Sequence, residues 1–84
     1  MHARHYRPQS PLHLLRSGEA PPAGDGVLLR MGREMPADPL AYAAALYETL
    51  HRLDVQHPPW IALELPPDTP EWAGVLDRLR RAAG

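Results

Sequence analysis

The five histidines are the side chains best suited to hold a metal ion. His2 and His5 lie three positions apart near the N-terminus, whereas His13, His51 and His57 are scattered along the rest of the chain. A zinc site needs three or four ligands that converge on one point. Nothing in this spacing brings the later histidines to the first pair, so the sequence predicts no metal site.

Carboxylates near strand ends are the second group that could do chemistry, as a general acid and base. Asp68 and Glu71 belong to a predicted helix start, where the helix dipole favours an acid, and Asp54 ends another predicted helix. Glu64 has no such explanation, because it lies within an apolar strand. We interpret Glu64 as an interface residue and expect no catalytic residue among these acids.

Nucleophiles and phosphate-binding loops are poorly represented. Ser10 and Ser17 are the only serines, and neither lies in a Gly-x-Ser-x-Gly context. Residues 24–26, Gly-Asp-Gly, precede a predicted strand, whereas a phosphate loop opens a helix. We therefore expect no nucleotide site and no cofactor within the chain. Arg78 lies in a basic helix end that the dipole explains, and it is also a candidate contact for a partner.

The first eleven residues have the composition of an extended arm. Two prolines and the lack of apolar periodicity argue against a helix there. Ten extended residues reach roughly 30 Å. An imidazole, an aromatic ring and a cation on such a stiff segment suit insertion into a partner's cleft. The residues that we expect to contact a partner or its nucleotide are His5, Tyr6, Arg7 and Pro8.

Two hydrophobic periods alternate along the rest of the chain. Asp38 and Pro39 give the first helix a strong start, as a capping side chain followed by a residue with a fixed φ. The elements that the pattern predicts are, in order, strand 12–15, strand 27–31, a helix from 39 to about 54, strand 60–65 and a helix from about 70 to 83.

Apolar positions within these elements predict the core. The first helix carries a stripe at spacings of three and four, which consists of Leu40, Ala43, Leu46, Tyr47, Leu50 and Leu53. The strand 60–65 is expected to be central and buried. Between both helices and the sheet we predict a core of Leu46, Leu50, Ile61, Leu63, Val75 and Leu79.

The order strand, strand, helix, strand, helix predicts an α/β fold. Two strands joined by a helix form a right-handed crossover unit with parallel strands. We therefore expect a small Rossmann-like sheet of about three strands with two helices, in two or three layers. Residues 1–11 would form the extended arm and residues 12–84 the domain.

Composition restricts the function classes. With 84 residues the chain holds one small domain. A net charge of −1 argues against direct DNA binding, and the lack of cysteine excludes disulfides and thiolate metal sites. No apolar run reaches the roughly 18 residues of a membrane span, so we expect a cytoplasmic protein without membrane contact. A homo-oligomer is compatible with this composition.

Several motifs together resemble one protein family. The segment His5-Tyr6-Arg7-Pro8, followed by Pro11-Leu12, is similar to the His-Tyr-x-Pro…Pro-Leu linker of two-domain threonylcarbamoyl-AMP synthases. Residues 42–54 resemble the Tyr-Ala-x-x-Leu-Tyr-x-x-Leu-Arg-x-Leu-Asp helix of the C-terminal domain of these enzymes. Residues 61–64, Ile-Ala-Leu-Glu, and 77–83, Asp-Arg-Leu-Arg-Arg-Ala-Ala, complete the series in the family's order.

The resemblance implies a synthase that makes threonylcarbamoyl-AMP from threonine, bicarbonate and ATP for modification of a tRNA adenosine. In this family the chemistry belongs to an N-terminal YrdC-type domain, which this sequence does not contain, and the linker crosses the mouth of its active site. The linker tyrosine near the bound nucleotide corresponds by the motif to Tyr6. Between Leu15 and Val27 this chain has a Pro/Gly loop where the family has a helix and a strand.

Two functions from different classes follow from these observations. The first is a non-catalytic accessory module that closes or orders the active site of a YrdC-type partner, where ATP and threonine are bound. The alternative is a free-standing interaction or dimerisation module without a role in the synthase. A small enzyme in its own right is a third interpretation, with no nucleophile, metal set or phosphate loop to support it.

Overall fold

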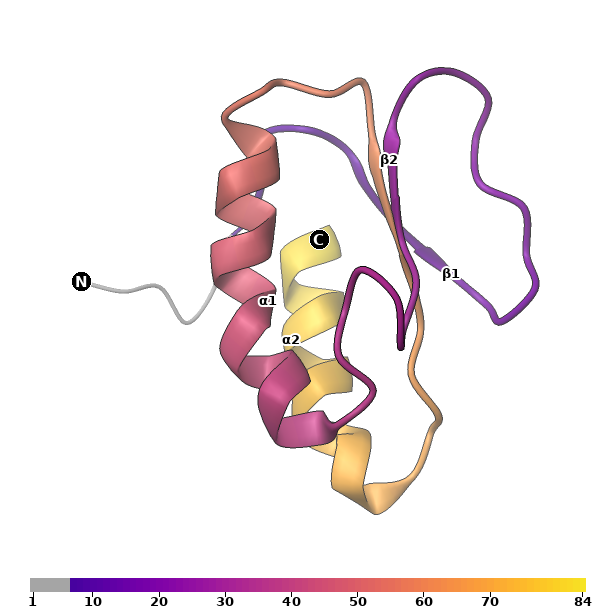
Figure 1. Ribbon diagram of the computed structural model, residues 1–84, viewed down its shortest axis with the longest axis vertical. Coiled ribbons are helices and arrows are strands. Elements are labelled where there is room, and N and C mark those ends of the chain that lie inside the picture. The colour runs from indigo at the N-terminus through magenta and orange to yellow at the C-terminus, as the bar shows by residue number, and fades with distance from the viewer. Residues whose placement is uncertain (1–6) are drawn as a thin grey trace.

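The computed structural model in Figure 1 describes residues 7–84. The strands β1 (Leu12–Leu15), β2 (Val27–Leu29) and β3 (Ile61–Glu64) form one parallel sheet in the order β1-β3-β2. The helices are α1 (Pro39–Asp54) and α2 (Ala73–Ala83), and a short 3-10 helix, η1 (Pro70–Trp72), precedes α2. The predicted α/β fold is confirmed, with β3 as the central strand.

Local signals fix both ends of α1. The carboxylate of Asp38 accepts a hydrogen bond from the backbone N–H of Ala41 at 2.9 Å, and Pro39 occupies the first helical turn. After α1, His57 adopts a left-handed conformation with φ of 53°, and Pro58 follows it. The helix therefore ends at Asp54, as the sequence predicts.

The strand β2 is two residues shorter than predicted. The backbone N–H of Arg30 donates to Oε1 of Glu34 at 2.9 Å, and the carbonyl of Arg30 accepts from the N–H of Met35 at 3.1 Å. These bonds close a turn directly after Leu29. The prediction that the strand continues to Met31 is wrong because the turn uses the backbone groups that a longer strand would need.

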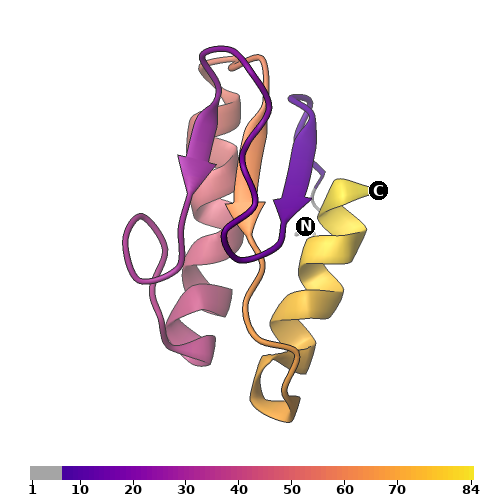
Figure 2. The same cartoon turned by 90° about the vertical axis from the view of Figure 1, so that its right-hand side faces the viewer.

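Both helices lie on one face of the sheet, and residues 16–26 cross the opposite face as an irregular loop (Figure 1, Figure 2). Of the two expected architectures, the described residues therefore form the two-layer one. Trp60 packs beneath the loop, and its indole Nε1 donates to the carbonyl of Ala23 at 2.9 Å. Gly26 lies so close to the indole ring that a Cβ at this position would overlap it.

The predicted core is confirmed. All six residues assigned to it are buried, and none is more than 3% exposed. They come from α1, β3 and α2, so the core holds both helices against the sheet. The central strand is buried on both faces, because Ala62 is as inaccessible as its neighbours Ile61 and Leu63.

The predicted stripe of α1 is wrong at its first position. Leu40 is 82% exposed, whereas Tyr42 is fully buried and packs edge-on against Trp72 with ring centroids 5.5 Å apart. Leu40 precedes Leu46 by six positions, which at about 100° per residue turns Leu40 roughly 120° away from the buried face. Successive spacings of three drift around the helix, and the drift carries Leu40 into solvent.

Candidate functional site

The arm reaches the folded body at the end of the molecule where both helices terminate. Of the four predicted arm contacts, His5 and Tyr6 lie outside the described residues. Arg7 is exposed and Pro8 is buried. Ser10, the last arm residue before Pro11, is only 7% exposed. The described part of the arm is therefore packed against the domain.

A single carboxylate fixes this part of the arm. Oδ2 of Asp54 accepts a hydrogen bond from the backbone N–H of Gln9, and Oδ1 accepts one from the N–H of Ser10, both at 2.9 Å. Asp54 is the last residue of α1, where the helix dipole disfavours a negative charge. The two N–H donors offset this unfavourable position, and charge-assisted hydrogen bonds of this kind are stronger than neutral ones.

A second contact ties the arm to the end of α2. The guanidinium of Arg7 lies against Gly84, so closely that a Cβ at Gly84 would overlap it. A cation is favoured at a helix C-terminus, because the last carbonyl groups carry partial negative charge. The arm root, which we define as residues 7–10, therefore contacts the C-terminal ends of both helices.

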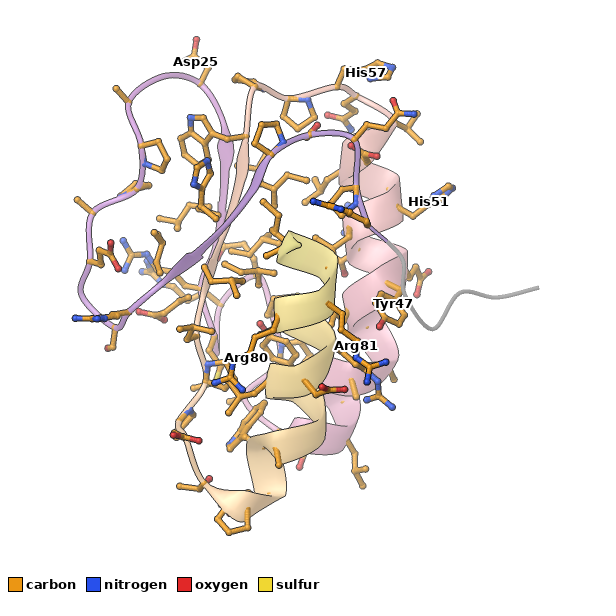
Figure 3. All side chains as sticks on the ribbon, turned by 180° about the vertical axis from the view of Figure 1, so that it is seen from behind. Asp25, Tyr47, His51, His57, Arg80 and Arg81 are labelled. Carbon is orange, nitrogen blue, oxygen red and sulfur yellow. The ribbon has the colours of Figure 1, made fainter. Side chains whose placement is uncertain are left out.

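A pocket of about 410 Å³ lies beside the arm root. Figure 3 shows His51 and His57 at this end of α1, with His51 pointing away from the sheet. The residues lining this arm-root pocket are Arg7, Gln9, His51, Asp54, Val55 and His57. Within residues 7–84, no group of three or more histidine or acidic side chains could hold a metal ion.

The other two predicted site residues lie elsewhere. Glu64 is half-buried at the end of β3, opposite Leu15 of β1 in the sheet register. Arg78 is exposed on α2, next to Asp77, whose carboxylate pairs with Arg81 at 3.2 Å. No hydrogen bond or ion pair connects Glu64 or Arg78 to the arm root in the part of the chain that the structure describes.

Sequence reasoning interpreted Asp54 as the end of a helix and missed its contact with the arm. One signal was available, because an acid at a helix C-terminus is unfavourable unless it has a partner. The identity of that partner could not be read from the sequence, since 44 and 45 positions separate Asp54 from the two donors.

The fold and the arm root define a small α/β domain that fixes the base of its own N-terminal segment. The family model for the threonylcarbamoyl-AMP synthase C-terminal domain matches residues 1–84, and the chain belongs to this family. The resemblance seen in the sequence is thereby confirmed. No curated protein and no solved structure shows significant similarity to the chain.

Family membership connects the chain with tRNA threonylcarbamoylation. The family is the C-terminal domain of a synthase, whose catalytic part lies in a YrdC-type domain. Among residues 7–84, no helix is both long and apolar enough to cross a membrane.

Proposed function

We propose that the chain is a non-catalytic accessory module that presents its arm to a YrdC-type catalytic domain and orders or closes the active site of that domain. In this proposal residues 1–11 are the arm and residues 12–84 the body that carries it. The proposal assigns the contacts with the catalytic partner to His5, Tyr6 and Arg7, whereas Pro8, the fourth residue predicted to make them, is buried in the body.

The double hydrogen bond of Asp54 is the observation that carries the proposal. Two successive backbone N–H groups held by one carboxylate restrict both the position and the direction of the chain at residues 9 and 10. Tyr6 is separated from this point by only two residues, so a fixed arm root limits the volume that its side chain can reach. A segment that is restricted before binding loses less conformational entropy when it binds.

The ordered arm root and the surface beside it support a module that acts by contacting another protein. Pro8 and Ser10 are buried in the body, so the arm root is part of the fold and does not need a partner to become ordered. The arm-root pocket offers Arg7, His51 and Val55 on the adjoining surface, and Val55 is 64% exposed. Tyrosine and arginine are the residues that most often carry the affinity of protein interfaces.

The proposal is tested by titrating a YrdC-type domain from the same genome with the chain, in the presence and absence of ATP and threonine. We expect Tyr6→Ala to weaken association by about 2 kcal/mol, or roughly thirtyfold, and to leave the stability of the chain unchanged. Asp54→Ala should weaken association as well, because it releases the arm root. Glu71→Gln is the matched control, since Glu71 is exposed in η1, which precedes α2 and lies at the opposite end of that helix from Gly84.

The same titration distinguishes the alternative function. Equal affinity of the wild-type chain, Tyr6→Ala and an arm-deleted variant would remove the arm from the mechanism. No binding by the wild-type chain would favour a free-standing interaction or dimerisation module. The chain alone should form no threonylcarbamoyl-AMP, and product formed by the pure protein would contradict the accessory role.

A further inference from the structure

A second pocket lies at the opposite end of the sheet from the arm root. Its volume is about 340 Å³, and residues that end or follow all three strands line it. Arg16 and Ser17 follow β1, Met31 follows β2, and Glu64 ends β3. Figure 2 shows that the three strands end at this common edge. Open parallel sheets bind their ligands outside the carboxyl ends of the strands, so we call this hollow the edge pocket.

The edge pocket contains two opposite charges that do not neutralise each other. Among residues 7–84, no ion pair joins the guanidinium of Arg16 to the carboxylate of Glu64, and the carboxylate of Glu64 accepts no hydrogen bond. Glu64 is half-buried, and partial burial of a charge is unfavourable unless a partner compensates it. The guanidinium of Arg16, which can bind an anion, and the carboxylate of Glu64, which can bind a cation, therefore line the same pocket.

The remaining walls of the edge pocket are apolar. They include the side chain of Met31 and the consecutive prolines Pro66 and Pro67, of which Pro66 is buried. Proline rings have a fixed φ and lose little entropy when they contact a ligand, so this wall is rigid. The occupant that fits these groups has a cation and an anion close together and an apolar side chain.

The charge of Glu64 acts on Tyr42, a residue of the core beneath the edge pocket. The hydroxyl of Tyr42 is buried and has no hydrogen-bond partner within residues 7–84. Burial raises the pKa of Tyr42, and the negative charge of Glu64 raises it further. The field of Glu64 therefore reaches into a poorly solvated region, where electrostatic interactions are stronger than in water.

We propose that the edge pocket binds a free α-amino acid with an apolar side chain. The ammonium group of the ligand donates hydrogen bonds to the carboxylate of Glu64. The ligand carboxylate accepts hydrogen bonds from the guanidinium of Arg16 and the hydroxyl of Ser17, in the planar geometry that arginine offers to carboxylates. The apolar side chain lies against Met31 and the two prolines. This site contains no arm residue, so a failure of this proposal would not count against the proposed role of the arm, and the reverse also holds.

The first test uses the unmodified chain and three related probes. L-leucine carries both charges, 3-methylbutylamine lacks the carboxylate, and 4-methylpentanoate lacks the ammonium group. Amide chemical shifts of Arg16, Ser17 and Glu64 are followed during titration of each probe to about 10 mM. We expect saturable shifts with L-leucine, and affinities at least roughly tenfold lower for both analogues, because 3-methylbutylamine loses the charge-assisted contact with the exposed Arg16 and 4-methylpentanoate loses the one with the half-buried Glu64.

Substitutions then assign each charge of the ligand to its residue. Glu64→Gln should lower the affinity for L-leucine at least roughly tenfold and abolish its advantage over 4-methylpentanoate. Arg16→Gln should abolish the advantage over 3-methylbutylamine. Glu48→Gln and Arg52→Gln, at exposed positions of α1, are the charge-matched controls and should bind as the wild-type chain does.

Three outcomes would overturn the proposal. No saturable shift with L-leucine would show that the edge pocket binds no amino acid of this class. Equal affinity for L-leucine and 3-methylbutylamine would indicate a site for cations only, and equal affinity for 4-methylpentanoate a site for anions only. All three outcomes come from the unmodified chain, so the folding of a variant does not affect them.

Discussion

Two acids at opposite ends of the parallel sheet are held in opposite ways. Asp54 accepts hydrogen bonds from the N–H groups of Gln9 and Ser10 and joins the arm to α1. Glu64 is half-buried in the edge pocket, where its carboxylate accepts no hydrogen bond from residues 7–84. The difference shows that an acid's partners, more than its burial or its distance from a strand end, indicate what it does. Asp54 acts within the fold, whereas Glu64 is available to a ligand.

The core that separates these two ends should give the largest effects. Leu63→Ala and Leu46→Ala remove fully buried side chains, and each should lower the free energy of unfolding by about 2–5 kcal/mol. Leu40→Ala is the matched control, because Leu40 is 82% exposed and its loss should cost no more than about 0.5 kcal/mol. Urea denaturation measures all three. A Leu63→Ala midpoint equal to that of the parent would contradict the assigned core.

Substitution of Asp54 should have the next largest effect, and substitution of Glu64 a much smaller one. Asp54→Ala leaves two backbone N–H groups without their acceptor, one of them partly buried, and should lower the free energy of unfolding by about 1–3 kcal/mol. Asp54→Asn keeps one carbonyl acceptor and should lose less. Glu64→Gln removes a charge that has no hydrogen-bond or ion-pair partner among residues 7–84 and should shift stability by less than about 0.5 kcal/mol.

Urea denaturation of the three variants side by side tests this difference. Hydrogen exchange at Gln9 and Ser10 adds a local readout, since only the Asp54 variants should accelerate it. If Glu64→Gln destabilised the chain as much as Asp54→Ala, Glu64 would be a structural residue and the distinction between the two acids would be wrong.

Features that depend on near neighbours in the sequence could be predicted. The start of α1 was predictable because Asp38, Pro39 and Ala41 form the cap within four positions. The buried central strand was predictable from its apolar run, and the two helices from their period. The exposure of Leu40 was predictable as well but was missed, because the helical period alone turns Leu40 roughly 120° from Leu46. The side chain buried in this first turn is Tyr42, which packs against Trp72.

Features that depend on distant contacts could not be predicted. The contact of Asp54 with the arm, and that of Trp60 with Ala23, join residues 37 to 45 positions apart. Glu64 was singled out as a polar residue in an apolar strand, yet the sequence could not show that Arg16 shares its pocket. Chain folding alone brings those charges together, so their chemistry became visible only in the structure.

Glu34 is a third acid that can be compared with Asp54 and Glu64, and its substitution should have the smallest effect. Glu34 lies in the turn after β2, at the same end of the sheet as Glu64, but it has a partner. The N–H of Arg30 donates to its carboxylate at 2.9 Å. This bond, followed by one from the backbone of Glu34 itself and by smaller contributions from the charges of Arg33 and Arg30, lowers the pKa of Glu34 below its ordinary value of 4.5. A carboxyl whose pKa is lower in the folded chain stabilises the fold above the unfolded pKa, and this stabilisation is lost as pH falls through the folded pKa.

Glu34→Gln should therefore be less stable than the wild-type chain at about pH 6, and the gap should narrow on acidification to about pH 3, because a growing fraction of Glu34 is then protonated in the folded chain. The difference should be smaller than that caused by Asp54→Ala, because Glu34 is exposed and solvent screens its charge. Urea denaturation at both pH values measures it. A gap that stayed constant or widened toward acid would mean that the Arg30 bond does not favour the charged form. A narrowing gap would place Glu34 with Asp54, which also accepts hydrogen bonds from backbone N–H groups, and apart from Glu64, which merely lies at the same end of the sheet.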